Sequence, residues 1–166
     1  MNQPKQYGIL SLPVIVAALG YFVDIYDLLL FSIIRVPSLQ SLGLNETQIA
    51  DDGLKIINIQ MIGLLIGGIL WGILGDKLGR MKVLFASIIL YSLGNIANGF
   101  VETVNQYATV RFISGVGLAG ELGASITLVS EILSKEKRGL GTSVVAGIGL
   151  TGAVFAFIMK DRKSVV

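Results

Sequence analysis

Five long apolar runs constrain this chain more than any other feature of its sequence. They cover residues 9–34, 54–74, 83–100, 107–133 and 140–158. A helix rises about 1.5 Å per residue, so about 20 apolar residues cross the roughly 30 Å hydrocarbon core of a bilayer. The alternating ten-residue pattern of a membrane β-barrel is not visible. The other structure whose backbone N–H and C=O groups all find hydrogen-bond partners in lipid is the α-helix. The sequence therefore predicts an all-α membrane protein with five transmembrane helices.

The composition supports lipid as the main solvent. Hydrophobic residues make up 53% of the chain and charged residues only 14%, whereas soluble domains are about 25% charged. Cysteine and histidine are both absent, which excludes disulfides, thiol nucleophiles, His-ligated metals and imidazole bases. The net charge of +2 is small and scattered, which argues against nucleic acid. We therefore expect no enzyme activity, no metal, no cofactor and no nucleic-acid partner, and a lipid bilayer as surroundings.

The charged loops predict how the helices are oriented. The loops after the second and fourth runs are basic, whereas the other two are mostly acidic. The basic loops carry Lys77, Arg80 and Lys82, then Lys135, Lys137 and Arg138; the others carry Glu46, Asp51, Asp52 and Lys55, then Glu102. Lys and Arg collect on the cytoplasmic side. The first run is too long for a signal-peptide core, so we expect an uncleaved first helix, a cytoplasmic N-terminus and location in the inner or plasma membrane.

Glycine and proline positions add detail to the predicted helices. The chain has 21 glycines, and Gly63 with Gly67, then Gly68 with Gly72, lie four residues apart in the second run. Such spacing lets helices approach closely in lipid, although glycine is also simply common in membrane helices. Pro13 and Pro37 fall near the two ends of the first run, where a helix tolerates them.

The loop after the second run holds the most specific motif, GILGDKLGRMK over residues 72–82. It resembles the signature loop of the major facilitator superfamily, which matches at Gly72, Asp76, Lys77, Gly79 and Arg80. Met81 departs from the pattern, because this position is usually basic. Gly79 is expected to form the turn. The resemblance implies a cytoplasmic gate, in which the aspartate binds basic groups and a helix N-terminus of the other half of the transporter. The charges alone would also satisfy the positive-inside rule.

Four ionisable residues lie inside the runs: Asp24, Asp27, Arg111 and Glu121. Burying such groups in lipid costs about 2.5 to 3.5 kcal/mol each, so they indicate function. Helical rise places Asp24 about 22 Å, Asp27 about 27 Å and Arg111 about 24 Å from the cytoplasmic edge. An ion pair between the first and fourth helices is therefore expected, with either aspartate as a proton carrier and Arg111 as its partner. The alternative is that the aspartates, Asp27 above all, are merely hydrated.

The fourth run adds a second resemblance, in RFISGVGLAGE over residues 111–121 followed by Glu131 and Arg138-Gly139. It is similar to the fourth helix of the sugar-porter and organic-acid symporter branch of the same superfamily. The resemblance implies that Arg111 is proton-coupling or lies beside substrate, and that Glu131 joins Arg80 and Arg138 in a cytoplasmic charge network. Glu121 lies about 9 Å from the cytoplasmic edge. It could therefore belong to the proton-coupling residues or to the cytoplasmic charge network.

The resemblance implies a 12-helix transporter made of two six-helix bundles with substrate held between them. Residues 1–160 would then be a truncated N-terminal bundle whose partner is a missing C-terminal half. Residues 161–166 are expected to be a non-native tail, because they resemble translated adapter sequence; an ordinary basic end is the alternative.

The leading functional hypothesis is proton-coupled symport of a sugar or small organic anion by alternating access, with the fragment alone inactive. A facilitative carrier or antiporter is the alternative within transport. A transporter-like membrane receptor without flux is the alternative from another class.

Overall fold

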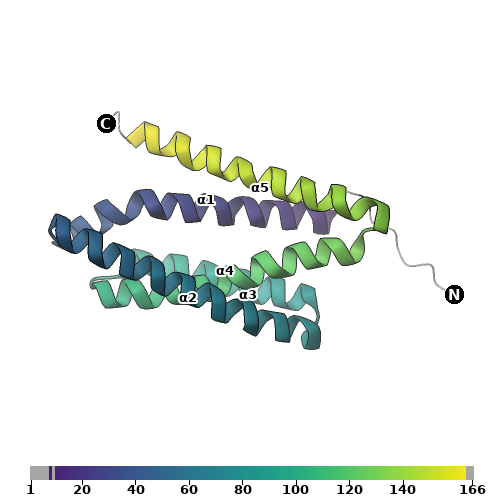
Figure 1. Ribbon diagram of the computed structural model, residues 1–166, viewed down its shortest axis with the longest axis horizontal. Helices are drawn as coiled ribbons and strands as arrows, with labels where there is room; N and C mark the ends of the chain where they lie inside the picture. The colour runs from purple at the N-terminus through teal and green to yellow at the C-terminus, as the bar shows by residue number, and fades with distance from the viewer. Residues whose placement is uncertain (1–7, 9, 164–166) are drawn as a thin grey trace.

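The fold is a bundle of long helices joined by short loops (Figure 1). The computed structural model describes residue 8 and residues 10–163. Within this range the helices are α1 (Leu12–Ser41), α2 (Glu46–Leu78), α3 (Arg80–Ala97), α4 (Val104–Ile132) and α5 (Lys135–Lys163), with a short 3₁₀ turn η1 (Asn98–Phe100) after α3. Five helices of the described part are long and apolar enough to cross a bilayer. The predicted all-α class is therefore confirmed.

Most helix ends extend beyond the apolar runs from which they were predicted, whereas α3 ends at Ala97, before the predicted residue 100. α1 continues through Pro37 to Ser41, where Gly43 with φ 80° ends it. α2 begins at Glu46 rather than at Leu54, because Asn45 caps it: the Asn45 side chain accepts a hydrogen bond from the Gln48 N–H at 2.9 Å. Hydropathy detects only the segment in hydrocarbon, so it misses polar first and last turns.

Two expectations about the ends of the chain are only partly described. Ile9, the expected start of the first helix, lies outside the described residues. α5 continues to Lys163, which covers part of the expected tail at 161–166, whereas residues 164–166 lie outside the described part.

Helix α4 is the centre of the bundle. Figure 1 shows α1 and α5 side by side in one layer, and α2 and α3 against α4 in the other. Over an apolar segment of 18 residues in α4, 56% of the residues are buried, compared with 28% or less in the corresponding segments of the other helices. Separate apolar clusters join α4 to α1 and α5, to α1 and α2, and to α3. A side chain on α4 can therefore contact groups from every other helix.

Glycines set how closely α2 and α4 approach. A Cβ at Gly63 would clash with the Phe112 carbonyl oxygen, and one at Gly67 would lie 2.7 Å from the Val116 Cα. A Cβ added at Gly68 or Gly72, in contrast, would meet nothing within 4 Å in the described part of the chain. The expected close approach is therefore made by the first glycine pair, and the second pair lies on an open face.

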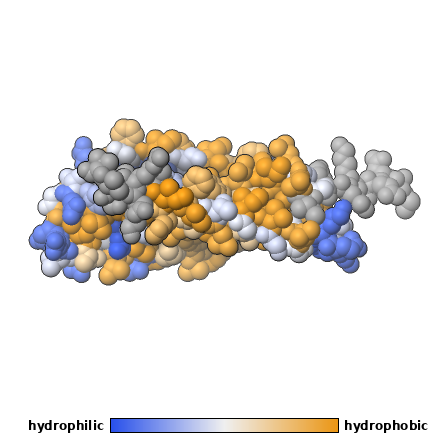
Figure 2. All heavy atoms as spheres, turned by 90° about the horizontal axis from the view of Figure 1, so that it is seen from above, coloured by the Kyte–Doolittle hydropathy of each residue, from blue (hydrophilic) through white to orange (hydrophobic). Residues whose placement is uncertain are grey.

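The outer surface of the bundle fits a bilayer. Figure 2 shows apolar side chains over the middle of the visible face and hydrophilic side chains at both ends. Large apolar residues stay exposed on several helices, for example Leu65 at 68%, Leu93 at 59% and Phe155 at 56%. An apolar surface of this extent is unfavourable in water. It is the surface expected of helices that contact lipid tails.

Candidate functional site

A buried ion pair joins α1 to α4 near the middle of the bundle. The Arg111 Nη1 lies 3.4 Å from the Asp27 Oδ2, and the two side chains are 8% and 18% exposed. The guanidinium carbon also lies 3.8 Å from the centre of the Phe31 ring. The cation is thus held between a carboxylate and an aromatic face, which are the two groups that best compensate a buried guanidinium.

A second carboxyl group lies beside this pair without any cation. Asp24 is 0% exposed, and neither of its carboxylate oxygens has a hydrogen-bond partner in the described structure. Its electrostatic neighbours are Glu121 and Asp27, and Glu121 is itself only 4% exposed. Gly20 makes room for Glu121, because a Cβ at that position would clash with the Glu121 Oε1.

The ion pair expected between the first and fourth helices forms with Asp27 rather than with Asp24. Arg111 was expected to lie level with both aspartates, yet it pairs with Asp27 while Asp24 neighbours Glu121. Helices α1 and α4 are antiparallel, so the deeper acid of α1 meets the deeper acid of α4.

Several uncharged polar residues are also buried inside the bundle, and the sequence analysis missed them. Each is almost fully buried and has a side-chain atom without a hydrogen-bond partner in the described residues. They are Gln60 on α2, Tyr91 on α3, and Ser114 and Ser125 on α4. Buried polar groups usually find partners, and those that do not are often functional or hydrated. Their burial depends on helix packing, so single residues of these types carry no signal in the sequence.

A separate charge network lies at the end of the bundle where α2 meets α3. Gly79 makes the turn with φ 93°, as predicted. The Arg80 Nη2 lies 2.6 Å from the Asp76 Oδ1, and its Nε lies 3.4 Å from the Glu131 Oε1 on α4. Arg80 therefore links the motif loop to α4.

The remaining motif residues do not join this network in the described structure. The Arg138 Nε donates to the Leu133 carbonyl oxygen at 3.2 Å, so its contact is with the backbone rather than with Glu131. Lys77 is exposed in the last turn of α2, and Gly72 is exposed on the open face of that helix.

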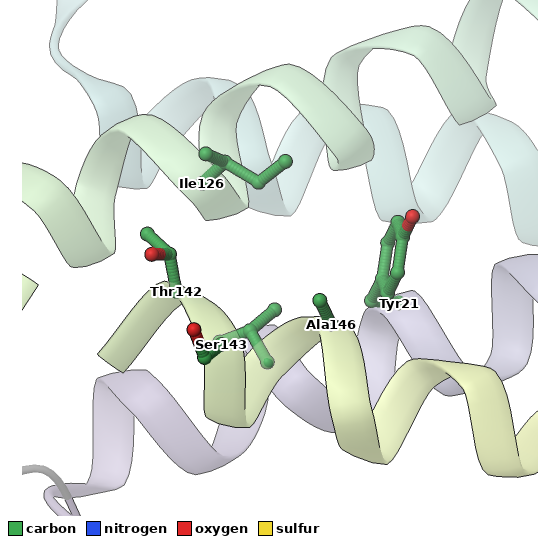
Figure 3. Close-up of a pocket in the computed structure, with 6 residues that line it drawn as sticks. Tyr21, Ile126, Thr142, Ser143 and Ala146 are labelled. Carbon is green, nitrogen blue, oxygen red and sulfur yellow. The ribbon is translucent and has the colours of Figure 1, made fainter. Parts of the chain in front are cut away.

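A cavity of about 300 Å³ lies between α1, α4 and α5. Figure 3 shows Tyr21 at one end, Ile126 descending from α4, and Thr142, Ser143 and Ala146 rising from α5. None of these residues is charged, and the Thr142 hydroxyl donates to backbone carbonyls of its own helix. The cavity is therefore neutral and mostly apolar, unlike the ion-pair region.

Comparison with known proteins gives a family match over most of the chain. The family model described as Major Facilitator Superfamily matches residues 17–159. The chain is 32% identical over 124 residues to the niacin transporter NiaP of Acinetobacter baylyi, covering 75% of this chain and 27% of that protein. It is 30% identical over 151 residues to the benzoate transport protein of Acinetobacter baylyi, covering 87% and 32%.

A plant protein is similar to the same degree. The inorganic phosphate transporter 1-4 of Arabidopsis thaliana is 32% identical over 167 residues, covering 89% of this chain and 31% of that protein. The chain thus spans about a third of the length of these relatives.

Proposed function

The chain belongs to the major facilitator superfamily, and on that premise we propose that it serves proton-coupled symport of a small organic anion or a sugar by alternating access. The family consists of multi-pass membrane transporters rather than enzymes. The observation that carries the proposal is the buried Asp27–Arg111 pair beside the buried, uncompensated Asp24. Such groups are too costly in a membrane helix to be retained without a role.

Arg111 is proposed to bind the negative group of the substrate. Its contact with Asp27 is 3.4 Å, longer than the 2.7 to 2.9 Å typical of strong charge-assisted bonds. An entering anion can therefore compete with Asp27 for the guanidinium. The relatives support an anion over a sugar, because benzoate, niacin and inorganic phosphate, after which they are named, are all negatively charged at neutral pH.

Asp24 and Glu121 are proposed to carry the coupled proton. They are neighbours, both are buried, and neither forms an ion pair in the described residues. Two carboxylates close together in a medium of low dielectric repel each other strongly. A shared proton removes this repulsion, and it can be loaded or released as the site opens to one side or the other. Asp27, which was the other candidate carrier, is instead proposed to serve as the partner of Arg111, which it contacts at 3.4 Å.

The network of Asp76, Arg80 and Glu131 is proposed to be the cytoplasmic gate, with Lys77 and Arg138 at its edge. Its ion pairs are partly exposed, with side-chain exposures of 24% for Arg80 and 71% for Asp76. Pairs of this kind contribute about 1 kcal/mol or less. They can therefore break and reform in each transport cycle.

The surroundings of the bundle follow from the same reasoning. We propose that residues 1–160 form part of the first of two helix bundles, that the second bundle completes the substrate site, and that the N-terminus faces the cytoplasm of an inner or plasma membrane. The basic loops at one end of the bundle support this orientation.

Uptake by the full-length protein in proteoliposomes tests the function. Radiolabelled benzoate, nicotinate, inorganic phosphate and glucose would be offered with an acidic exterior, with equal pH, and with a protonophore. We expect at least one anion to accumulate only under the proton gradient. Asp24→Asn should abolish accumulation but keep exchange of substrate across the membrane, whereas Glu102→Gln, at the exposed far end, should behave as wild type.

Other outcomes would identify the alternatives. Uptake that is equal with and without the gradient would indicate a facilitative carrier. Uptake driven by a gradient of the opposite direction would indicate an antiporter. Binding of an anion without any movement across the membrane would indicate a receptor.

A further inference from the structure

Arg111 is held on its flat face by an aromatic ring as well as at its edge by Asp27. The guanidinium carbon lies 3.8 Å from the centre of the Phe31 ring on α1. This is the separation of carbon atoms in van der Waals contact, so the ring lies against the face of the guanidinium group, on which arginine commonly stacks. The stack is therefore a second contact between the two helices that form the ion pair.

The Phe31 ring is itself fixed by its neighbours. Tyr107 on α4 meets it edge to face, with ring centres 5.9 Å apart and ring planes at 83°. The centre of the Tyr107 ring also lies 5.8 Å from the guanidinium carbon. Phe31 and Tyr107 are 4% and 2% exposed and belong to an apolar cluster that includes Ile56 of α2. A ring packed by three helices cannot turn freely.

Regular helical spacing brings the cation, the carboxylate and the rings together. On α1, Phe31 follows Asp27 by four residues, and on α4 Arg111 follows Tyr107 by four residues. Residues at this spacing lie on one face of a helix. The face of α1 thus presents a carboxylate and a ring one turn apart, and Arg111 contacts both.

The face and the edges of the guanidinium group serve different partners. Its N–H groups lie in the plane of the group, so a ring on the face leaves all of them free to bind anions. Asp27 contacts Nη1 at 3.4 Å, whereas Nε is buried and has no hydrogen-bond partner in the described residues. A carboxylate or phosphate group can therefore begin to bind at the unused donor, and Asp27 can leave, while the stack on Phe31 stays in place.

We propose that Phe31 is a positioning residue, which holds the Arg111 guanidinium in one orientation while its anionic partner changes from Asp27 to the substrate. The proposal rests on the function proposed above and adds the contact that persists through this exchange. Without the ring, the arginine side chain would be free to turn as soon as Asp27 released it. Substrate binding would then have to order the side chain again, and this cost weakens binding.

Uptake kinetics of the full-length protein test this role. The probe is whichever of radiolabelled benzoate, nicotinate and inorganic phosphate the wild-type protein takes up. Phe31→Leu keeps an apolar side chain but removes the aromatic face. The KM for the probe should rise roughly 3- to 10-fold, whereas the maximum rate should change by less than about twofold. Phe31→Tyr restores the aromatic face and should bring the KM back towards the wild-type value.

Phe22→Leu is the matched control. Phe22 lies on the same helix and meets Phe155 of α5 edge to face, with ring centres 5.6 Å apart, so it makes the same kind of ring contact away from Arg111. Its KM should equal that of wild type. If Phe31→Leu does not accumulate in the membrane, Phe31→Met replaces it, because methionine is also apolar and has no ring.

Two results would overturn the proposal. One is an unchanged KM in Phe31→Leu, and the other is an equal rise in Phe31→Leu and Phe22→Leu. Either result would leave proton-coupled uptake standing. Uptake that does not depend on the proton gradient would instead refute the coupling, and the comparison of KM values would still hold.

Discussion

The Asp27–Arg111 pair makes a quantitative prediction about stability. At 3.4 Å two unit charges attract by about 5 kcal/mol at an effective dielectric constant of about 20. Asp27→Asn removes this attraction and leaves the guanidinium buried. Part of the loss is compensated, because the cation keeps its contact with the Phe31 ring at 3.8 Å, worth up to about 2 kcal/mol. We expect a net loss of about 3 kcal/mol, within the range measured for breaking buried pairs.

Thermal unfolding of the purified full-length protein measures this effect. A loss of about 3 kcal/mol corresponds to a fall in Tm of roughly 6 to 12 °C for a domain of about 150 to 250 residues, and to a smaller fall for the longer full-length protein. The double variant Asp27→Asn, Arg111→Gln should recover at least half of the fall, because it removes the uncompensated cation. Glu102→Gln, an exposed control, should stay within about 0.5 kcal/mol of wild type. An Asp27→Asn protein that is as stable as wild type would refute the reasoning, since it would mean that the pair is hydrated.

Three further changes test other parts of the fold by the same unfolding measurement. Gly117→Ala should destabilise the protein by about 1 to 3 kcal/mol, because the added Cβ would lie 2.6 Å from the Tyr91 backbone nitrogen on α3. Gly123→Ala should be neutral or stabilising, because a Cβ there would meet nothing within 4 Å. Equal effects of the two changes would contradict the close crossing of α3 and α4. Asn45→Ala should lower the free energy of unfolding by about 1 kcal/mol, because it removes the N-cap of α2. An unchanged free energy of unfolding would mean that other contacts hold the start of α2. Asp76→Asn should change stability by less than about 1 kcal/mol, because its pair with Arg80 is exposed. It should still alter the rate of uptake, because this pair is part of the proposed cytoplasmic gate. A large loss of stability would assign Asp76 a structural role.

Much of the fold follows from the sequence because an apolar segment that crosses a bilayer must be about 20 residues long. Its backbone groups must also be hydrogen-bonded within the segment, which favours an α-helix. The five helices and the turn at Gly79 were predictable for that reason. The helix ends were not, since the polar turns at Asn45 and beyond Pro37 lie outside the apolar runs. The local cap of α2 carries a readable signal, because Asn45 and Gln48 have the spacing of a capping box.

The candidate site was predictable in its members but not in its pairing. Charges inside apolar runs are conspicuous, so all four ionisable groups were found. Which acid meets Arg111 depends on how the two helices are rotated and packed, and hydropathy does not show this. Tyr91 could not be found at all, because a single tyrosine in a membrane helix is ordinary until packing buries its hydroxyl group.

The clearest sign of proton coupling is proton movement that accompanies substrate entry. Full-length protein would be reconstituted with a pH-sensitive dye inside the liposomes, at equal pH on both sides, and a transported anion would be added outside. We expect the lumen to acidify as the anion enters with wild-type protein, and we expect Asp24→Asn to stop the acidification. Anion entry without any change of internal pH in the wild-type protein would refute proton-coupled symport.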